Sequence, residues 1–542
     1  RGLGDVYKRQ KSYYMKLKKV LTLLPLLATT ALVASCGNNS SSSSSSSKPS
    51  TSSTTPSTSS TTKPTSSSSS SSGDNGGLDL SSVVDENGVI TVPTTVTLWS
   101  TTGKATQPAL EKYIEEFKSA QPNVTVTNEY VSGSYSDLEN KVVTGFSSNN
   151  YPDLVVAYPD HVADYLDYGK AVDLSAFILN DYVGLTEEDA NDYVDSFMSE
   201  GMNYTQTGMY SVPWCKSTEL MFYNETLIGV DLSAYDATIN NGNALDADYL
   251  NSLTWEELFN KLCPALEKYN TANNNSLYDP ETGGILGYDS DDNLFITLAE
   301  QYGYNYTSVN KVTGKGSVDF NNPEMKALMT TFHNAATKKY IFTKGTNNGN
   351  YVNTVFTEGK CVFSIGSTGG VKYQFSDTNP MNIGTARIPH AEGKDPKVIL
   401  QGPSMAVLDH NNLAQKTAAW LLWKTLTSED NALDWALESG YMPVRKSSYE
   451  DQEYIDACDY TACAPRTVDR LKAKAYSACA EVLTDTFTSP VFIGSSATRS
   501  AVGGLVTQCL IKDSWSLTGS ELDSYIDGKF ADAENTAKLA IK

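Results

Sequence analysis

Two runs of serine divide the chain into a part that can fold and a part that cannot. Eight serines follow one another over 40–47 and seven more over 66–72, and only Ser, Thr, Pro and Lys lie between the two runs. A segment without apolar side chains has no surface to bury against the entropy cost of ordering it. We therefore expect a disordered tether over 37–77 and a folded body over 78–542.

The segment before the tether has the composition of an export signal. Met15 is followed by three lysines and then by an apolar stretch over 20–35 that is short for a membrane-spanning helix. We expect 15–35 to be a signal peptide and 1–14 to be a non-native leader. The residues Val33 to Gly37 resemble a bacterial lipobox, which implies lipidation of Cys36. The alternative is an ordinary signal whose cleavage site lies near a cysteine.

The charge of the chain excludes some classes of partner. There are 41 Lys+Arg against 63 Asp+Glu, a formal charge of −22. Without residues 1–35 the balance becomes 34 − 62 = −28. A nucleic-acid-binding protein needs a basic surface, and adsorption to anionic lipid needs basic residues as well. We expect no nucleic-acid partner, and membrane contact only through the lipid anchor.

The cysteines and histidines predict neither a metal site nor a cofactor. Seven cysteines remain beside Cys36, so they cannot all pair with one another; Cys458 and Cys463 are close enough in sequence to bridge, but free thiols are equally consistent. No CxxC motif occurs and the four histidines are isolated. Acidic residues over 289–300 have the spacing of a calcium loop, but Leu294 stands where the turn requires glycine and the segment looks helical.

Strand and helix patterns alternate along the body. Short β-rich runs over 95–99, 123–131 and 153–157 are separated by segments with helical spacing over 108–120 and 134–146. Further helices are predicted over 254–269, with a capping box at Thr254 and a kink at Pro264, and over 323–339, 414–427, 431–439 and 520–540. Strands separated by helices of this length predict an α/β fold.

Eight local signatures carry a family resemblance. They occur over 97–104, 123–138, 151–159, 208–224, 254–262, 355–370, 440–450 and 492–502. In this order they resemble the extracellular solute-binding lipoproteins of bacterial ABC importers, in the group that binds sugars and glycerol 3-phosphate. The resemblance implies a two-lobed periplasmic-binding-protein-like fold with a ligand cleft between lobes joined by crossing segments. We assign 90–218 plus 355–400 to the first lobe and 219–354 plus 401–542 to the second.

The same resemblance implies a function. We expect a monomer, anchored on the outer face of the cytoplasmic membrane, that captures a carbohydrate or a glycerol-phosphate-type solute and delivers it to the permease subunits of an importer. No enzymatic activity is implied. A secreted carbohydrate-active hydrolase and a surface sensor or adhesin remain alternatives, since acidic pairs are abundant and the fold does not by itself specify transport.

Candidate ligand-binding residues follow the predicted strands or lie in short polar loops, where a cleft binder places them. Each also has a purely structural interpretation, such as core packing for Trp99, a helix cap for Asp160, a backbone-bonded hydroxyl for Ser217 or a turn for Gly402. The candidates from such positions are Trp99, Ser100, Tyr135, Asp160, Trp214, Ser217, Ser367, Thr368 and Gly402.

The role of Ser217 rests on the resemblance, because the matching serine of the glycerol-3-phosphate-binding relatives contacts ligand, and two further candidates rest on it as well. The counterparts of Tyr441 and Arg499 in the glycerol-3-phosphate-binding relatives contact ligand, and the arginine pairs with phosphate, for which its planar fork of donors is suited. The alternatives are packing of Tyr441 against its own helix end and an interlobe ion pair for Arg499. No acidic residue occurs over 99–104, where those relatives have one. A neutral sugar is therefore as consistent with the sequence as a phosphate ester.

Overall fold

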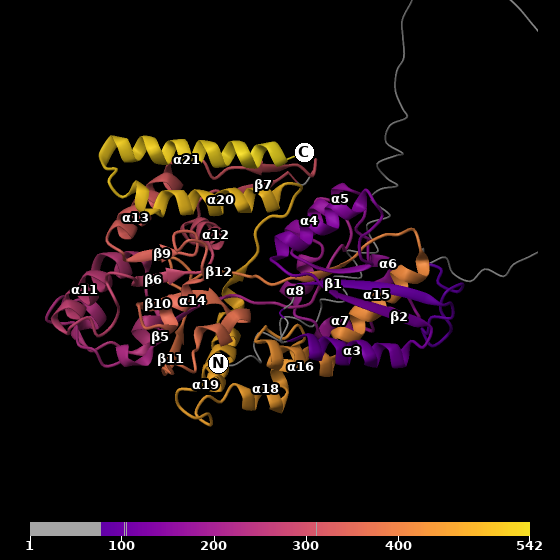
Figure 1. Cartoon of the computed structure of the whole chain (residues 1–542). Coiled ribbons are helices and arrows are strands. Elements are labelled where there is room, and N and C mark those ends of the chain that lie inside the picture. Colours follow the sequence, from indigo (N-terminus) through magenta and orange to yellow (C-terminus); the bar gives the residue numbers. More distant parts are fainter. Residues whose placement is uncertain (1–76, 102, 104–105, 311, 542) are drawn as a thin grey trace, which may run out of the picture. The chain divides into compact units, whose positions relative to one another are not determined.

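The computed structural model describes residues 77–542 except 102, 104–105, 311 and 542. The predicted leader, signal peptide and lipidated Cys36, and the tether up to residue 76, lie outside the described residues. The compact body begins at Leu80 and contains two separate five-stranded sheets. Each sheet is the centre of one lobe, so the α/β, two-lobed prediction is confirmed (Figure 1).

The first lobe is built on the sheet β2-β1-β3-β13-β4, in which β1 lies parallel to β2 and β3, and β13 runs antiparallel to both β3 and β4. Its strands are β1 Thr94–Ser100, β2 Val124–Tyr130, β3 Leu154–Ala157, β4 Val212–Pro213 and β13 Ser404–Val407. Its helices are α3 Gln107–Ala120, α4 Tyr135–Phe146, α5 Pro159–Asp167, α6 Ser175–Ile178, α7 Glu187–Asp192, α8 Asp195–Glu200, α15 Leu413–Leu426 and α16 Glu429–Ser439, followed by α17 Lys446–Glu450 and α18 Gln452–Ala457.

The second lobe is built on the sheet β11-β5-β10-β6-β9, with β10 parallel to β6 and antiparallel to β5. Its strands are β5 Glu219–Asn224, β6 Gly284–Tyr288, β9 Ile341–Thr343, β10 Cys361–Ser367 and β11 Ile383–Ala386. Its helices are α9 Ala247–Asn251, α10 Trp255–Glu257, α11 Cys263–Ala272, α12 Asp291–Tyr302, α13 Pro323–Thr337, α14 Val352–Thr357, α19 Val468–Val482, α20 Ser495–Leu510 and α21 Gly519–Ala540. Two small ladders pair β7 Thr307–Val309 with β8 Gly316–Val318 and β12 Val398–Ile399 with β14 Thr486–Phe487.

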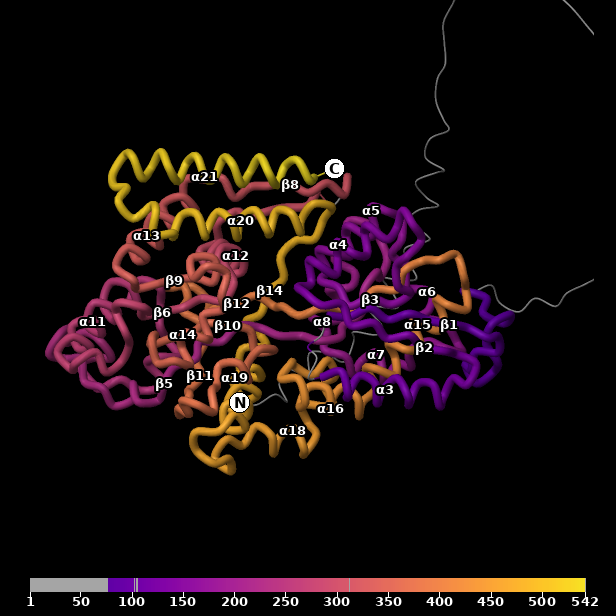
Figure 2. The backbone as a smooth tube through the Cα atoms, viewed as in Figure 1, coloured from indigo at the N-terminus to yellow at the C-terminus, as the bar shows by residue number. Residues whose placement is uncertain are grey.

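The chain crosses between the sheets at 214–218 and again at 400–403 (Figure 2). These two segments run side by side, since Ser217 forms a β-bridge with Gln401, and Lys216 forms another with Met442. The crossing points differ from our assignment. Strands β10 and β11 pair in the second sheet and β13 pairs with β3 in the first, so 355–400 belongs with the second lobe and the segment from 404 through α16 with the first. The sequence of a short buried strand does not indicate which sheet the strand joins, so the lobe of each segment could not be assigned from the sequence.

The predicted local elements are confirmed by their caps. Ser134 caps α4 and forms a reciprocal capping box with Asp137, and Gly440 ends α16 with a positive φ of 84°. The side chain of Thr254 accepts from the backbone N–H of Glu257, which is one of the two bonds of the predicted capping box. Pro264 does not break the helix, which continues to Ala272; a π-helical turn over Leu258–Leu262 precedes the proline, which cannot donate to the helical ladder. The apolar side of helix α21 packs on α20, and the two helices lie side by side in Figure 1.

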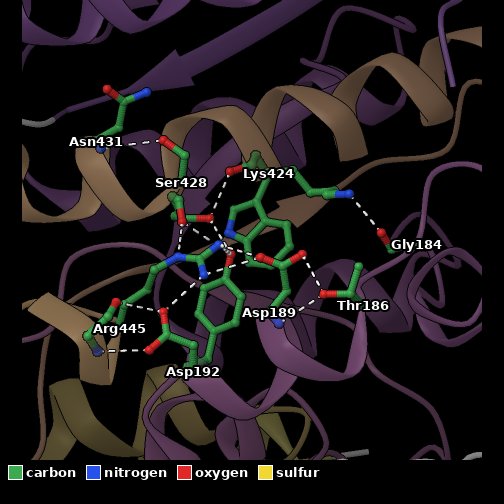
Figure 3. Close-up of polar contacts among 12 residues, drawn as sticks. Gly184, Thr186, Asp189, Asp192, Lys424, Ser428, Asn431 and Arg445 are labelled. Carbon is green, nitrogen blue, oxygen red and sulfur yellow. Dashed lines mark hydrogen bonds and ion pairs between the residues drawn. The ribbon is translucent and has the colours of Figure 1, made fainter. Parts of the chain in front are cut away.

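Buried charge holds the segment after α16 on the first lobe. Arg445 donates to the carbonyl of Thr427 at 2.6 Å and forms ion pairs with Asp189 and Asp192 of α7, at 3.4 and 3.1 Å (Figure 3). Lys424 of α15 donates to the carbonyl of Gly184 at 2.7 Å in the same region. A buried guanidinium that bonds to two carboxylates and a carbonyl fixes the path of the chain just beyond Met442, the residue that forms the β-bridge with Lys216.

The seven cysteines of 77–541 are free, and five of them are buried, so neither Cys458 nor Cys463 forms the bridge that their spacing allowed. No helix in the described ranges has the length and apolar composition to cross a membrane.

Candidate ligand-binding site

A cavity of about 480 Å³ lies where the two lobes and the crossing segment meet. The first lobe contributes the N-terminus of α4 (134–136) and the β3–α5 junction (158–161). The second contributes the β6–α12 junction (289–293), Lys344, and residues of α20 between 496 and 507. The crossing segment contributes 399–402. A concave site formed by both lobes has the geometry that encloses a small solute.

Tyrosines form one wall of this region. The capping box at Ser134 places Tyr135 at the first position of α4, and its ring meets that of Tyr158 edge to face, with centroids 4.8 Å apart. The hydroxyls of Tyr135 and Tyr441 are 3.5 Å apart. Burial raises the pKa of all three hydroxyls, so they stay protonated and can donate hydrogen bonds at neutral pH. Aromatic faces with a hydroxyl edge suit a ligand with both apolar and hydroxyl surfaces.

An ion-pair network crosses the cavity from lobe to lobe. Arg499 of α20 pairs through Nε with Asp292 at 2.7 Å and through Nη1 with Asp160 of α5 at 4.0 Å, and it also donates to Asn293. Asp160 accepts a second bond, from the hydroxyl of Ser495, at 2.8 Å. Burial raises the pKa of the Asp160 carboxyl, and the Arg499 charge and the Ser495 bond oppose that rise. The interlobe ion pair, one of the two interpretations of Arg499, is thus the arrangement present.

Further carboxylates line the second-lobe side. Asp291 accepts from Thr343 at 2.5 Å and from the backbone of Gly345 at 2.9 Å, so it ties the start of α12 to the loop after β9. Asp289 accepts from the backbone of Val352 at 2.6 Å, and burial raises its pKa to about 6. These carboxylates can accept hydrogen bonds from ligand hydroxyls. No group of three metal-ligating side chains lies together among the described residues.

The floor of the cavity is fixed by a buried lysine. Lys216 lies in the first crossing segment and is fully buried. Its ammonium pairs with the carboxylate of Glu200, a residue that lines the cavity. Its ammonium also donates to the carbonyl of Gly402 at 3.2 Å and the hydroxyl of Ser404 at 3.0 Å. Gly402 has a φ of 91°, and a Cβ there would lie 1.9 Å from the carbonyl oxygen of Cys215. Only glycine fits where the two crossing segments approach so closely.

The structure brings together four of the predicted residues, Tyr135, Asp160, Gly402 and Arg499, in the lining of this cavity. Tyr441 reaches it only through the hydroxyl of Tyr135. The others do not line the cavity, and their ligand contacts stay predictions. Trp99 belongs to the hydrophobic core of the first lobe, with the Lys141 ammonium 4.1 Å from its ring centre.

The remaining predicted residues occupy structural positions close to the crossing. The ring of Trp214 packs on Trp435 with centroids 4.6 Å apart. Ser217 is buried and bonded to Gln401 through its backbone, and Thr368 accepts from the backbone of Thr218 at 3.2 Å. The Ser367 side chain caps the short helix that follows β10, and Ser100 is buried at the end of β1.

Sequence reasoning missed the second-lobe side of the cavity. Strands β6 and β9 of the second lobe are followed by Asp292, Asn293 and Lys344, just as strand β3 of the first lobe is followed by Asp160. The sequence does contain a signal for this side of the cavity, because the short strand-like run over 284–288 ends at Tyr288 and is followed by the acidic start of a helix. Residues 289–300 have the spacing of a calcium loop, and the structure forms helix α12 over Asp291–Tyr302.

Comparisons with known proteins agree with this geometry. A family model described as bacterial extracellular solute-binding protein matches residues 112–462. No curated protein matches the chain significantly. Among solved structures, UgpB from Mycobacterium tuberculosis in complex with glycerophosphocholine is 18% identical, with a TM-score of 0.60, over 82% of this chain and 98% of that one. The cyclic alpha-maltosyl-1,6-maltose binding protein from Arthrobacter globiformis is 18% identical, with a TM-score of 0.59, over 82% and 100% of the two chains.

A third solved structure is an ABC substrate-binding protein from Listeria monocytogenes in complex with cycloalternan. It is 16% identical, with a TM-score of 0.60, over 82% of this chain and 99% of that one. Identities this low establish the fold alone. The family match extends over well more than half of the chain, and the two lobes with a cavity between them are consistent with it. The chain therefore belongs to the family of bacterial extracellular solute-binding proteins.

Proposed function

We propose that this protein is the solute-binding component of an ABC importer, which captures a small hydroxyl-rich solute of carbohydrate or glycerophosphodiester type. The observation that carries the proposal is the cavity lined by both lobes and the crossing segment. Solved structures of similar fold include sugar-bound and glycerophosphocholine-bound proteins, which supports this class of ligand.

The lining suits hydroxyl-rich ligands. Tyr135 and Tyr158 offer ring surface and protonated hydroxyls, while Asp160 and Asp289 offer carboxylate oxygens. A pyranose ring presents an apolar face that packs on aromatic rings and equatorial hydroxyls that donate to carboxylates. Gly402 lines the cavity beside these groups, and the direction in which its side chain would point is taken by the Cys215 carbonyl of the other crossing segment.

Lobe closure is the proposed mechanism of capture. The lobes are joined by the crossing segments, so they can rotate about 214–218 and 400–403. A solute that contacts both lobes binds the closed form more tightly than the open form, and it shifts the population by that difference in affinity. The closed protein would then dock on the permease subunits, with binding and release but no chemical turnover of the solute.

The location of the protein is part of the proposal. We propose that Cys36 carries a lipid anchor and that the serine-rich segment holds the monomeric body at the outer face of the cytoplasmic membrane. The extracellular character of the family and the sequence over 15–36 support this assignment. Labelling with a palmitate analogue, compared between the wild type and Cys36→Ala, tests it directly. An unlabelled wild type would contradict the anchor and leave the binding proposal intact.

Calorimetry tests the binding proposal. The mature body is titrated with maltose, maltotriose, a cyclic glucan and glycerophosphocholine, and we expect at least one dissociation constant in the micromolar range or below. Tyr135→Ala should weaken that binding by 10-fold or more, since it removes ring surface from the wall. Tyr182→Ala, which truncates an exposed tyrosine of the first lobe, is the matched control and should bind as the wild type does. Absence of binding by every member, or equal affinity of Tyr135→Ala, would count against the proposal.

A further inference from the structure

The cavity lining carries more negative than positive charge. Its carboxylates are Asp160, Glu200, Asp289, Asp291 and Asp292, and its cations are Lys344 and Arg499. His161 adds no charge, because burial lowers the pKa of its ring to about 3. One of the carboxylates, Glu200, is neutralised by Lys216 from behind. The remaining groups leave an excess of negative charge around the space that a ligand would occupy.

Both cations of the lining have partners. The guanidinium of Arg499 lies between Asp292 of the second lobe and Asp160 of the first, and it also donates to the side-chain oxygen of Asn293. The ammonium of Lys344 lies 3.8 Å from the ring centre of Tyr351. The Nε and Nη2 donors of Arg499 are used by Asp292 and Asn293, and Nη1 faces Asp160 at 4.0 Å, so a phosphate or carboxylate group that approached Arg499 would lie close to two carboxylates.

The acidic partners of Arg499 are themselves held in place. Asp160 accepts from Ser495, and Asp292 accepts from the hydroxyl of Ser290 at 2.5 Å. Asn293 donates to Glu219 at 2.9 Å, and Glu219 also accepts from Tyr288. Neither carboxylate can turn away from Arg499 without breaking a second hydrogen bond. The arrangement is therefore a built network and not a chance surface contact.

We propose that Asp160 and Asp292 are specificity-determining residues, which occupy Arg499 and exclude solutes that carry a net negative charge. This inference rests on the proposed function and narrows it to uncharged or zwitterionic hydroxyl-rich solutes. It removes free phosphate monoesters from the ligand class, although the family resemblance pairs this arginine with phosphate. The negative cavity repels the anion, and the Nε and Nη2 donors of Arg499 are already used by Asp292 and Asn293.

A gain of anion binding tests the inference. Inorganic phosphate and glycerol 3-phosphate are titrated into the mature body by calorimetry at 50 mM NaCl. We expect no measurable binding to the wild type, with dissociation constants above 10 mM. The variant Asp160→Asn/Asp292→Asn keeps the size of both side chains, frees the guanidinium and should bind glycerol 3-phosphate at least 30-fold more tightly. Adding Arg499→Gln to this variant should abolish the gain.

Controls separate specificity from charge and from folding. The variant Asp430→Asn/Asp523→Asn changes two exposed acids by the same net charge and should show no gain of phosphate binding. Circular dichroism of each variant verifies the fold. Micromolar binding of glycerol 3-phosphate to the wild type would overturn the inference, and so would a folded double variant with no gain. The neutral solutes are titrated into the same preparations, so failure of the proposed function is read separately from the behaviour of Arg499.

Discussion

Replacement of Lys216 by methionine gives a stability prediction that depends directly on the crossing geometry. The lysine is fully buried, and its ammonium is bonded to the Glu200 carboxylate, the Gly402 carbonyl and the Ser404 hydroxyl. Methionine fills similar volume without the charge. Glu200 would then be left buried, with the Ser404 hydroxyl at 3.3 Å as its remaining donor. Breaking a buried ion pair from one side costs about 3–5 kcal/mol, because the other charge stays desolvated.

A comparison with a partly buried lysine that has no carboxylate hydrogen-bond partner isolates the charge effect. Lys424 donates to the carbonyls of Val183 and Gly184 and leaves no carboxylate behind when it is removed (Figure 3). Lys424→Met should therefore cost only about 1–3 kcal/mol. Adding Glu200→Gln to Lys216→Met should restore most of the lost stability, since the orphaned charge is gone.

Urea unfolding followed by tryptophan fluorescence measures these differences. We expect Lys216→Met to lose about 3–5 kcal/mol. A Lys216→Met variant within about 1 kcal/mol of the wild type would refute the reasoning. So would a loss equal to that of Lys424→Met.

Three other substitutions test separate parts of the structure. Gly402→Ala should destabilise the protein by at least about 2 kcal/mol in the same urea assay, because its Cβ would meet the Cys215 carbonyl at a positive φ; an unchanged midpoint would contradict the crossing geometry. Ser134→Ala should cost about 1 kcal/mol through loss of the α4 cap, and a cost near zero would mean that the capping box contributes nothing. Burial raises the pKa of the Glu219 carboxyl from 4.5 to about 7, so its contribution to stability is full below pH 4.5 and falls by about 3 kcal/mol as the pH rises to 7. In Glu219→Gln, the melting temperature should not show this fall between pH 4.5 and 8. If the melting temperature of the variant falls with pH as steeply as that of the wild type, another group is responsible for the pH dependence.

Local structure could be predicted from the sequence because its causes are local. The capping box at Ser134 and Asp137 acts over three residues, and the irregular turn before Pro264 accompanies the missing N–H of the proline. Sheet membership could not be predicted in the same way. The two-residue strand β4 and the strand β5 are separated by five residues of crossing segment, yet they belong to different sheets. Burial on both faces makes such strands alike in sequence.

Only part of the site could be predicted from the sequence, because the fold brings together residues that are far apart in the chain. Strand ends pointed to Asp160, and the resemblance pointed to Arg499, but the partner Asp292 lies 207 positions before Arg499 and only the fold brings them together. Trp99 and Trp214 illustrate the opposite error. An aromatic ring at a strand end packs equally well on a ligand or on the core, and here Lys141 covers the first ring and Trp435 the second.

Hydrogen–deuterium exchange with and without a bound solute tests the central claim, that the solute is held between the two lobes. With the tightest-binding member of the calorimetry panel, we expect slower exchange in both lobes together: over 134–137 and 158–161 in the first, over 289–293 and 496–507 in the second, and over 399–402 in the crossing segment. Protection confined to one lobe, or to a surface outside these segments, would contradict capture in the cleft.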